Sequence, residues 1–307
     1  MPNRELEIGR PAAAEMARGL DLAWEHIAQP HRAQQIARTL AEWRDAVDPT
    51  AVLLVARAGG EVVGGAWAQL QPGGTALLSP PRVAVGEPAA TADRLLDELM
   101  TELAGRQVRL VQVLLTADHG PDFERLTRGQ FEHVADLLYM VALASAFPDS
   151  PPAAELQFEP YAESEQQRLA ALVERTYEGT RDCPRMNGLR ETADVLSGYR
   201  AAGRFDPGRW FFLRHAGRDV GCLLLTEHPE HRQWELVYIG LVPEVRGRSW
   251  GIEAVRRAQA VAAQAQATCL LLAVDAANEP AVAMYAAAGF AAWDRRSVLV
   301  RVLADRS

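Results

Sequence analysis

Arginine and glycine residues gather in one short segment, Arg246-Gly247-Arg248-Ser249-Trp250-Gly251, shortly after an apolar run that ends at Leu241. This pattern predicts a buried strand, a tight loop and then a helix. The first N–H groups of a helix lack internal partners, and the helix dipole favours an anion beside them. Glycine allows close backbone approach, so a pyrophosphate fits such a loop. A plain strand-to-helix turn with surface arginines is the alternative interpretation.

A second motif covers residues 278–290 with the sequence NEPAVAMYAAAGF. Asn278 or Glu279 is expected to cap a short helix, Pro280 suits its first turn, and Gly289 ends it. Together, the arginine-glycine loop and this helix resemble the GNAT superfamily of acetyl-CoA-dependent acyltransferases. The specific similarity covers about Trp210–Val302 and extends by order of elements to the rest of the chain.

The resemblance implies that acetyl-CoA is the co-substrate, with no metal. Coenzyme A would lie where two adjacent parallel strands, expected at Trp234–Leu241 and Thr268–Val274, move apart. The backbone of the first strand would pair with the pantetheine arm, the loop would bind the pyrophosphate, and Asn278 would contact the arm near its thiol. The implied contacts are Ile239, Gly240, Leu241, Arg246, Gly247, Arg248, Ser249, Trp250, Gly251 and Asn278. Ser249 departs from the family, which has glycine there.

The catalytic residues implied by the resemblance are Glu235 and Tyr285. An alkylammonium must lose a proton before it attacks a thioester, and a carboxylate working through water can accept that proton. Glu235 is the expected base, and strand alternation predicts that it shares a face with Val237, Ile239 and Leu241. Tyr285 is the expected acid or hydrogen-bond donor to the departing thiolate. The N–H of Leu241 would stabilise the oxyanion.

The acceptor pocket of this family is commonly built in part by the loop between its first two helices. Here that loop spans residues 177–188 and carries Glu178 and Asp182, which could pair with an ammonium group. We expect Cys183 to be a pocket-wall thiol, because no histidine lies close in sequence. Ala273 stands where family members that modify protein N-termini usually carry a glutamate. We therefore expect a small-molecule amine as acceptor. A non-catalytic acyl-CoA sensor or scaffold is the alternative.

The elements that must position these residues occur twice along the chain. Both halves are expected to have the same order of elements: a strand hairpin, a third strand, a helix, a strand, a short helix and a last strand. The helix lies near Thr91–Ala104 in the first half and near Trp250–Gln266 in the second. The sequence thus predicts an α+β fold with two tandem GNAT-like domains, each a mixed, mostly antiparallel sheet flanked by helices. The proline-rich segment Phe147–Pro152 is the expected linker between domains at 1–147 and 153–307.

The first half lacks the arginine-glycine loop and has Ser79-Pro80-Pro81 and Pro88 at the equivalent place. Proline removes the N–H groups that an anion site needs. The first half is therefore expected to be a degenerate copy, in a tandem layout similar to that of mycothiol synthase.

The amino-acid composition excludes some classes of function. The 307 residues contain 32 basic side chains, all of them arginine, so any lysine-dependent chemistry is excluded. A net charge of -8 argues against nucleic-acid binding. The three cysteines have no metal-ligand spacing. Because their odd, scattered spacing argues against a disulfide framework, the sequence predicts a cytoplasmic protein. Without a signal-like start or an apolar stretch long enough for a membrane span, no membrane partner is expected. It does not indicate an oligomeric state.

Overall fold

The computed structural model describes residues 5–45, 50–116, 120–148 and 155–303. Two compact units are present: Met1–His133 with Val298–Ser307 form the first, and Val134–Ser297 form the second. Each combines a sheet with flanking helices, as the sequence predicts. Most of the expected linker, from residue 149 onward, lies outside the described residues.

The first unit contains a sheet in the order β1-β2-β3-β4-β5, followed by the last residues of β12. Its strands are β1 (Leu6–Gly9), β2 (Ala51–Ala58), β3 (Glu61–Gln71), β4 (Thr75–Val83) and β5 (Leu110–Thr116). Its helices are α1 (Met16–Ala23), α2 (His31–Asp45), α3 (Ala89–Gly105) and α4 (Pro121–Arg128). The apolar side chains of α3 lie on one buried face, which packs this helix against β2, β3 and β4.

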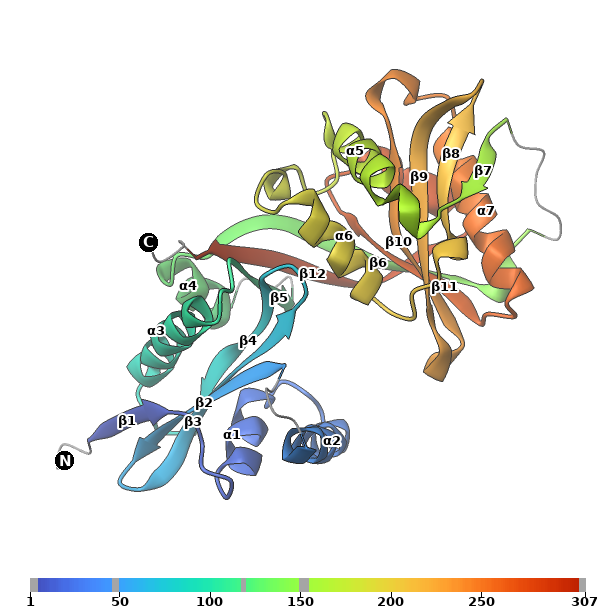
Figure 1. The fold of residues 1–307 in the computed structure, drawn as a ribbon. Helices are drawn as coiled ribbons and strands as arrows, with labels where there is room; N and C mark the ends of the chain where they lie inside the picture. Colours follow the sequence, from blue (N-terminus) through green and yellow to red (C-terminus); the bar gives the residue numbers. More distant parts are fainter. Residues whose placement is uncertain (1–4, 46–49, 117–119, 149–154, 304–307) are drawn as a thin grey trace. The chain divides into compact units, whose positions relative to one another are not determined.

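The second unit has the sheet order β12-β6-β11-β10-β9-β8-β7. Its strands are β6 (Glu132–Leu143), β7 (Gln157–Pro160), β8 (Trp210–His215), β9 (Arg218–His228), β10 (Gln233–Leu241), β11 (Cys269–Asp275) and the first part of β12 (Ala291–Val302). Its helices are α5 (Gln166–Tyr177), α6 (Thr192–Ala201), α7 (Trp250–Gln264) and α8 (Glu279–Ala287). Figure 1 shows α7 and α5 with α6 on opposite faces of this sheet.

Each face of the second unit's sheet has its own apolar core. Leu223, Leu225, Trp234 and Leu236 pack with α7 and α8, on the side that we name the α7 face. Cys222, Leu224 and Tyr238 pack with α5 and α6 on the other side, the α5 face.

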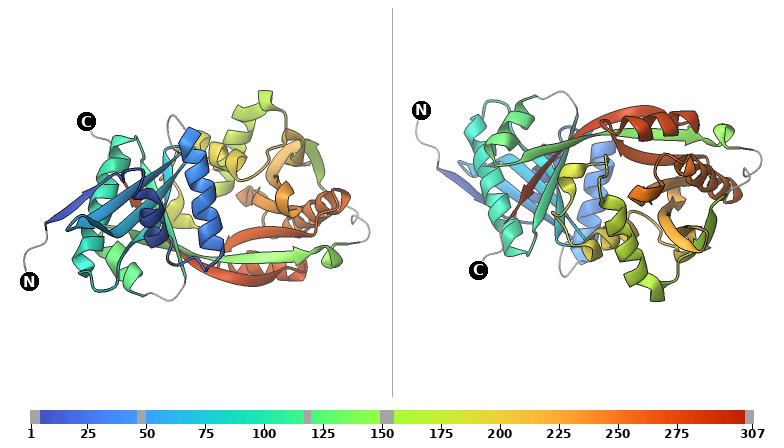
Figure 2. Two further views of the ribbon diagram at one scale, coloured as in Figure 1. Left: turned by 90° about the horizontal axis from the view of Figure 1, so that it is seen from below. Right: turned by 90° about the horizontal axis from the view of Figure 1, so that it is seen from above.

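Two long strands, β6 and β12, lie wholly or partly in a different unit from the one that their place in the chain suggests (Figure 2). β6 precedes the expected linker, yet it pairs antiparallel with β11 of the second unit, from Leu137↔Asp275 to Leu143↔Cys269. Conversely, β12 begins in the second unit, and its Leu299 is fully buried in the core of the first. The expected domain ranges, 1–147 and 153–307, follow the chain, whereas the compact units exchange these strand segments.

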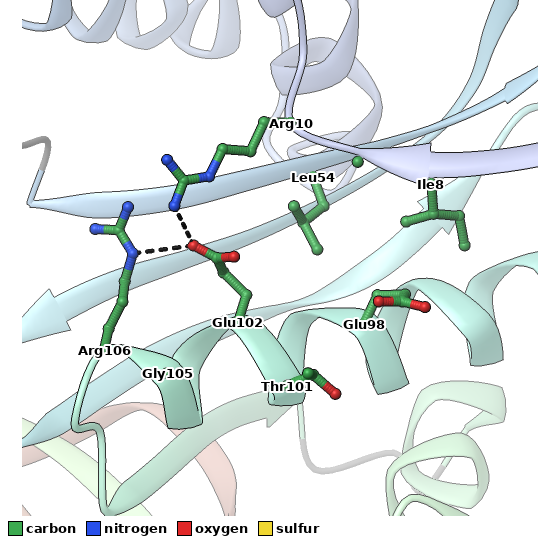
Figure 3. A pocket seen from close by; sticks show the side chains of 9 residues that line it. Ile8, Arg10, Leu54, Glu98, Thr101, Glu102, Gly105 and Arg106 are labelled. Atoms are coloured by element: carbon green, nitrogen blue, oxygen red, sulfur yellow. Dashed lines mark hydrogen bonds and ion pairs between the residues drawn. The ribbon is translucent and has the colours of Figure 1, made fainter.

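The first unit contains a cavity of about 430 Å³ between β1, β2 and the C-terminal half of α3 (Figure 3). Glu102 accepts hydrogen bonds from Arg10 and Arg106 at its rim, so one carboxylate is shared by two guanidinium groups. The cavity lies along α3 beyond its first turns. It is therefore not the counterpart of the arginine-glycine loop, which precedes a helix.

The strand exchange predicts that Leu299→Ala destabilises the first unit although residue 299 lies near the chain's end. Truncating a fully buried leucine costs about 2–5 kcal/mol. Val302→Ala is the matched control, because Val302 is 56% exposed. Urea unfolding with hydrogen exchange should show faster exchange in β2 and β3 for the first variant alone. Faster exchange confined to residues 134–297 would contradict this assignment.

Candidate active site

The predicted parting of two parallel strands is present between β10 and β11. They pair at only three positions, Gln233↔Cys269, Trp234↔Leu270 and Glu235↔Leu271. Beyond Glu235, β10 continues to pair with β9, and β11 continues to pair with β6 as far as Asp275. One edge of each strand is therefore free of sheet partners past this point.

The free edge of β10 presents backbone groups of Leu241 and Ile239. The N–H of Val242 donates to the carbonyl oxygen of Val220 on the β9 side, at 3.0 Å. Backbone groups of successive residues point to opposite sides of an extended strand. Those of Leu241 and Ile239 therefore point away from β9, towards the gap, whereas those of Gly240 point to β9. An extended ligand can add to such an edge as a further strand.

The arginine-glycine loop leads from β10 into α7, as predicted. Among the described residues, none accepts a hydrogen bond from the N–H groups of Ser249, Trp250 or Gly251. Gly247 and Ser249 both have positive φ angles, of 79° and 62°. The loop thus brings several free donors to the positive end of a 15-residue helix. That arrangement suits an anion such as a phosphate.

The side chains of this loop play different parts. The guanidinium of Arg246 donates to the carbonyl oxygens of Leu241, Gly179 and Thr176 at 2.9–3.1 Å, so it ties the loop to the end of α5. Arg248 is exposed, with its guanidinium over the ring of Trp250. The indole of Trp250 is itself buried, so only its backbone N–H remains for a ligand.

Two glycines of the predicted set allow close packing. A Cβ on Gly251 would stand 2.7 Å from the sulfur of Met284, so glycine lets α7 approach α8. A Cβ on Gly240 would stand 2.6–2.7 Å from side-chain atoms of Thr176 and Tyr238. Glycine there allows α5 to lie directly on the strand that borders the gap.

Glu235 occupies the last pair that joins β10 to β11, where the strands begin to part. The expected alternation is wrong, because the register with β9 shifts between Leu236 and Tyr238 and Val237 becomes an extra residue. Ile239 packs on the α7 face. Glu235 pairs with Thr226 and lies on the opposite, α5 face.

The Glu235 side chain has a partner that the sequence analysis missed. His228 Nε2 lies 2.8 Å from Glu235 Oε2, and both side chains are about one-third exposed. The pKa of Tyr139 in β6 is raised mainly by burial, and the charge of Glu235 adds to the rise. Its ring meets the exposed Trp293 edge-on, at 6.0 Å between centroids. No sequence signal links β6 to this face, because β6 lies in the other half of the chain.

Tyr285 lies on α8, buried against Phe290. Burial is the main cause that raises the pKa of its phenol, and the nearby Asp182 carboxylate adds to the rise. The hydroxyl thus stays protonated at neutral pH. No hydrogen bond to it occurs within the described ranges.

Asp182 and Cys183 lie against the end of β11. The Asp182 carboxylate accepts from the N–H of Asp275 at 2.9 Å and from the side chain of Asn278, and burial raises its pKa. In return, the N–H of Cys183 donates to the Asp275 carboxylate at 3.1 Å. Burial and these two carboxylates raise the pKa of the Cys183 thiol, which opposes a nucleophilic role.

The two predicted acceptor contacts, Asp182 and Glu178, have different surroundings. Asp182 is engaged in anchoring its loop to β11, whereas Glu178 is exposed at the C-cap of α5. Their roles towards a ligand stay predictions.

The first unit repeats the strand arrangement without the donors. β4 and β5 pair in parallel at three positions, Thr75↔Leu110, Ala76↔Val111 and Leu77↔Gln112. However, β4 runs on through Pro80 and Pro81, and the N-cap of α3 is Pro88. Proline has no N–H, so this helix start offers fewer donors than that of α7.

Residues 173–290 match the model of the acetyltransferase (GNAT) family. The chain carries a GNAT acetyltransferase domain. No curated protein sequence matches the chain. Among solved structures, a GCN5-related N-acetyltransferase from Sphaerobacter thermophilus is similar at 18% identity and a TM-score of 0.62, over 98% of this chain and 96% of that one.

Two further structures share this GNAT fold. The glucosamine N-acetyltransferase region of a fungal multi-domain GH3 β-N-acetylglucosaminidase has 14% identity and a TM-score of 0.64, over 98% of this chain and 38% of that one. A tandem GNAT protein of the clavulanic acid pathway has 16% identity and a TM-score of 0.53, over 97% and 98%. The tandem layout expected from the sequence is thus confirmed.

In the part of the chain that the structure describes, no helix combines the length and apolarity needed to cross a membrane. The same residues contain no group of three or more histidine, cysteine or acidic side chains that could bind a metal ion.

The left-handed conformation of Ser249 predicts that Ser249→Gly stabilises the protein. A residue with a Cβ is strained at a φ of 62°, and the Ser249 side chain makes no capping hydrogen bond that would be lost. The expected gain is about 1 kcal/mol in the free energy of unfolding, measured by urea titration. Ser249→Ala keeps the Cβ and should give no gain. Equal stabilisation by both variants would exclude backbone strain as the cause.

Proposed function

We propose that the chain transfers an acetyl group from acetyl-CoA to a primary amine of a small molecule. The observation that carries the proposal is the position of Glu235. It stands where β10 and β11 part, on the α5 face of the sheet, with its side chain 32% exposed. A carboxylate there lies next to any thioester bound between the strands.

The residues of the second unit fit coenzyme A along one path. The free N–H groups at the start of α7 would bind the pyrophosphate, with Arg248 adding positive charge. The free edge of β10 at Ile239 would pair with an amide of the pantetheine arm, which leaves the N–H of Leu241 for the thioester carbonyl. Asn278, at the N-cap of α8, would meet the arm near its thiol end.

The chemistry then needs a base, an oxyanion site and a donor to the thiolate. Glu235 would take a proton from the ammonium through a water, so that the neutral amine attacks the thioester carbonyl. The N–H of Leu241, which points into the gap, would donate to the oxyanion. Tyr285 would donate a hydrogen bond to the sulfur as the carbon–sulfur bond breaks. Because burial raises the pKa of Tyr285, it would stabilise the thiolate more than protonate it.

The acceptor class follows from the side chains around Glu235 on the α5 face. Tyr139, Trp293 and Ala273 present ring and small apolar surface there, and Trp293 is 62% exposed. This surface suits the carbon skeleton of a small amine. Glucosamine, the substrate named for one structural neighbour, belongs in the first panel of amines to be tested.

Calorimetry with acetyl-CoA should find one site per chain, because the segment before α3 has prolines where the arginine-glycine loop precedes α7. Arg248→Glu reverses the charge beside the expected phosphates and should weaken binding about tenfold or more, equivalent to about 1.4 kcal/mol. Arg232→Glu makes the same charge change at the other end of β10 and is the control. Two sites of similar affinity would refute the degenerate-copy interpretation of the first half.

Glu235→Gln should lower kcat by about 10²–10⁴-fold and leave acetyl-CoA affinity nearly unchanged, because a positioned base contributes about that much. Raising the pH should recover part of the rate, since more of the amine is then neutral without help. Tyr285→Phe should cost less, because a thiolate leaves tolerably unaided. The measurement is acetyl-CoA consumption across a panel of amines. Tight coenzyme A binding with no amine turned over would favour an acyl-CoA sensor.

A further inference from the structure

We propose that His228 is a positioning residue for Glu235, fixing the carboxylate so that one oxygen faces the reacting amine. This inference rests on the proposed function, since it assigns a second residue to the same site. His228 does not belong to either motif that identifies the fold family.

The pairing follows from the β9–β10 hairpin. His228 lies opposite Gln233, and Glu235 lies opposite Thr226, so His228 and Glu235 are diagonal neighbours on one face. Such neighbours are within reach of long side chains. Nε2 and Oε2 meet at 2.8 Å, a good hydrogen-bond distance.

The hydrogen bond uses only one carboxylate oxygen. When Glu235 is ionised, Nε2–H donates to Oε2, which fixes the imidazole tautomer and the direction of the carboxylate. Among the described residues, Oε1 has no hydrogen-bond partner, and the side chain is 32% exposed. A water that carries the ammonium proton can therefore reach Oε1. Without this partner, the Glu235 side chain would sample other rotamers and the rate of acetyl transfer would fall.

The imidazole ring is itself fixed by the segment that follows α6. A Cβ on Gly203 would stand 3.1 Å from Cε1 of His228 and 2.8 Å from the carbonyl oxygen of Glu227. The next residue, Arg204, donates its N–H to that same carbonyl oxygen at 2.8 Å. The backbone after α6 thus packs against the ring, and the ring in turn orients the carboxylate.

The test is a double-mutant cycle on the full-length protein, with acetyl-CoA and an amine that it turns over. His228→Ala should lower kcat about 10- to 100-fold, the range expected for one hydrogen bond to a charged group. The affinity for acetyl-CoA should not change. In the Glu235→Gln background, the same substitution should have no further effect, because there is no base left to orient. His231→Ala, an exposed histidine of the same turn, is the matched control.

A second pair of variants keeps the test sharp if alanine unfolds the hairpin. His228→Gln places an amide N–H near the position of Nε2 and should restore most of the rate. His228→Asn is too short to reach Glu235 and should not. Equal rates for these two variants would overturn the inference.

The outcomes separate this inference from the function on which it rests. If Glu235→Gln turns over amine at the full rate, Glu235 is not the base and the proposed mechanism fails. If Glu235→Gln is slow but His228→Ala is not, only the positioning role fails. Losses that multiply in the double variant would also overturn it, because His228 would then act independently of Glu235.

Discussion

The parting of β10 and β11 after Glu235 is the constraint on which the candidate site depends. Three pairs join the strands, and then each is paired on one side only, with β9 or with β6. That parting leaves the backbone of Leu241 without a sheet partner. It also places Glu235 next to the opening, while α7 starts from the end of the same strand. A continuous β10–β11 ladder would leave no edge for a ligand arm.

Local chemistry explains why much of the site could be predicted from the sequence. The arginine-glycine loop, the Asn278 helix start and the buried strands are encoded within short windows, and the structure has a turn, a helix or a strand where each was expected. The short edge strands β1 and β7 were missed, because four residues give too little alternation to detect.

The errors arise where distant residues decide the outcome. Val237 is an extra residue in β10, so the side chains that follow it lie on the face opposite to the one that simple alternation predicts. Nothing in the sequence around Val237 marks a bulge. As a result, Glu235 lies opposite Ile239 and Leu241, and its partner His228 could not be found by alternation along a single strand. The pairing of β6 with β11 likewise brings Tyr139 to this face from residues that precede the expected linker.

The strand exchange also bears on how the chain folds as it is made. Domains of a nascent chain generally fold in order, the N-terminal one first. Here the core of the first unit includes Leu299, and Arg301 donates to the carbonyl oxygen of Gly129, 172 residues earlier. The first unit therefore cannot close until Leu299 has been synthesised. Contacts so distant in sequence slow folding, and the core that covers β2 to β5 stays incomplete until the whole second unit has been synthesised.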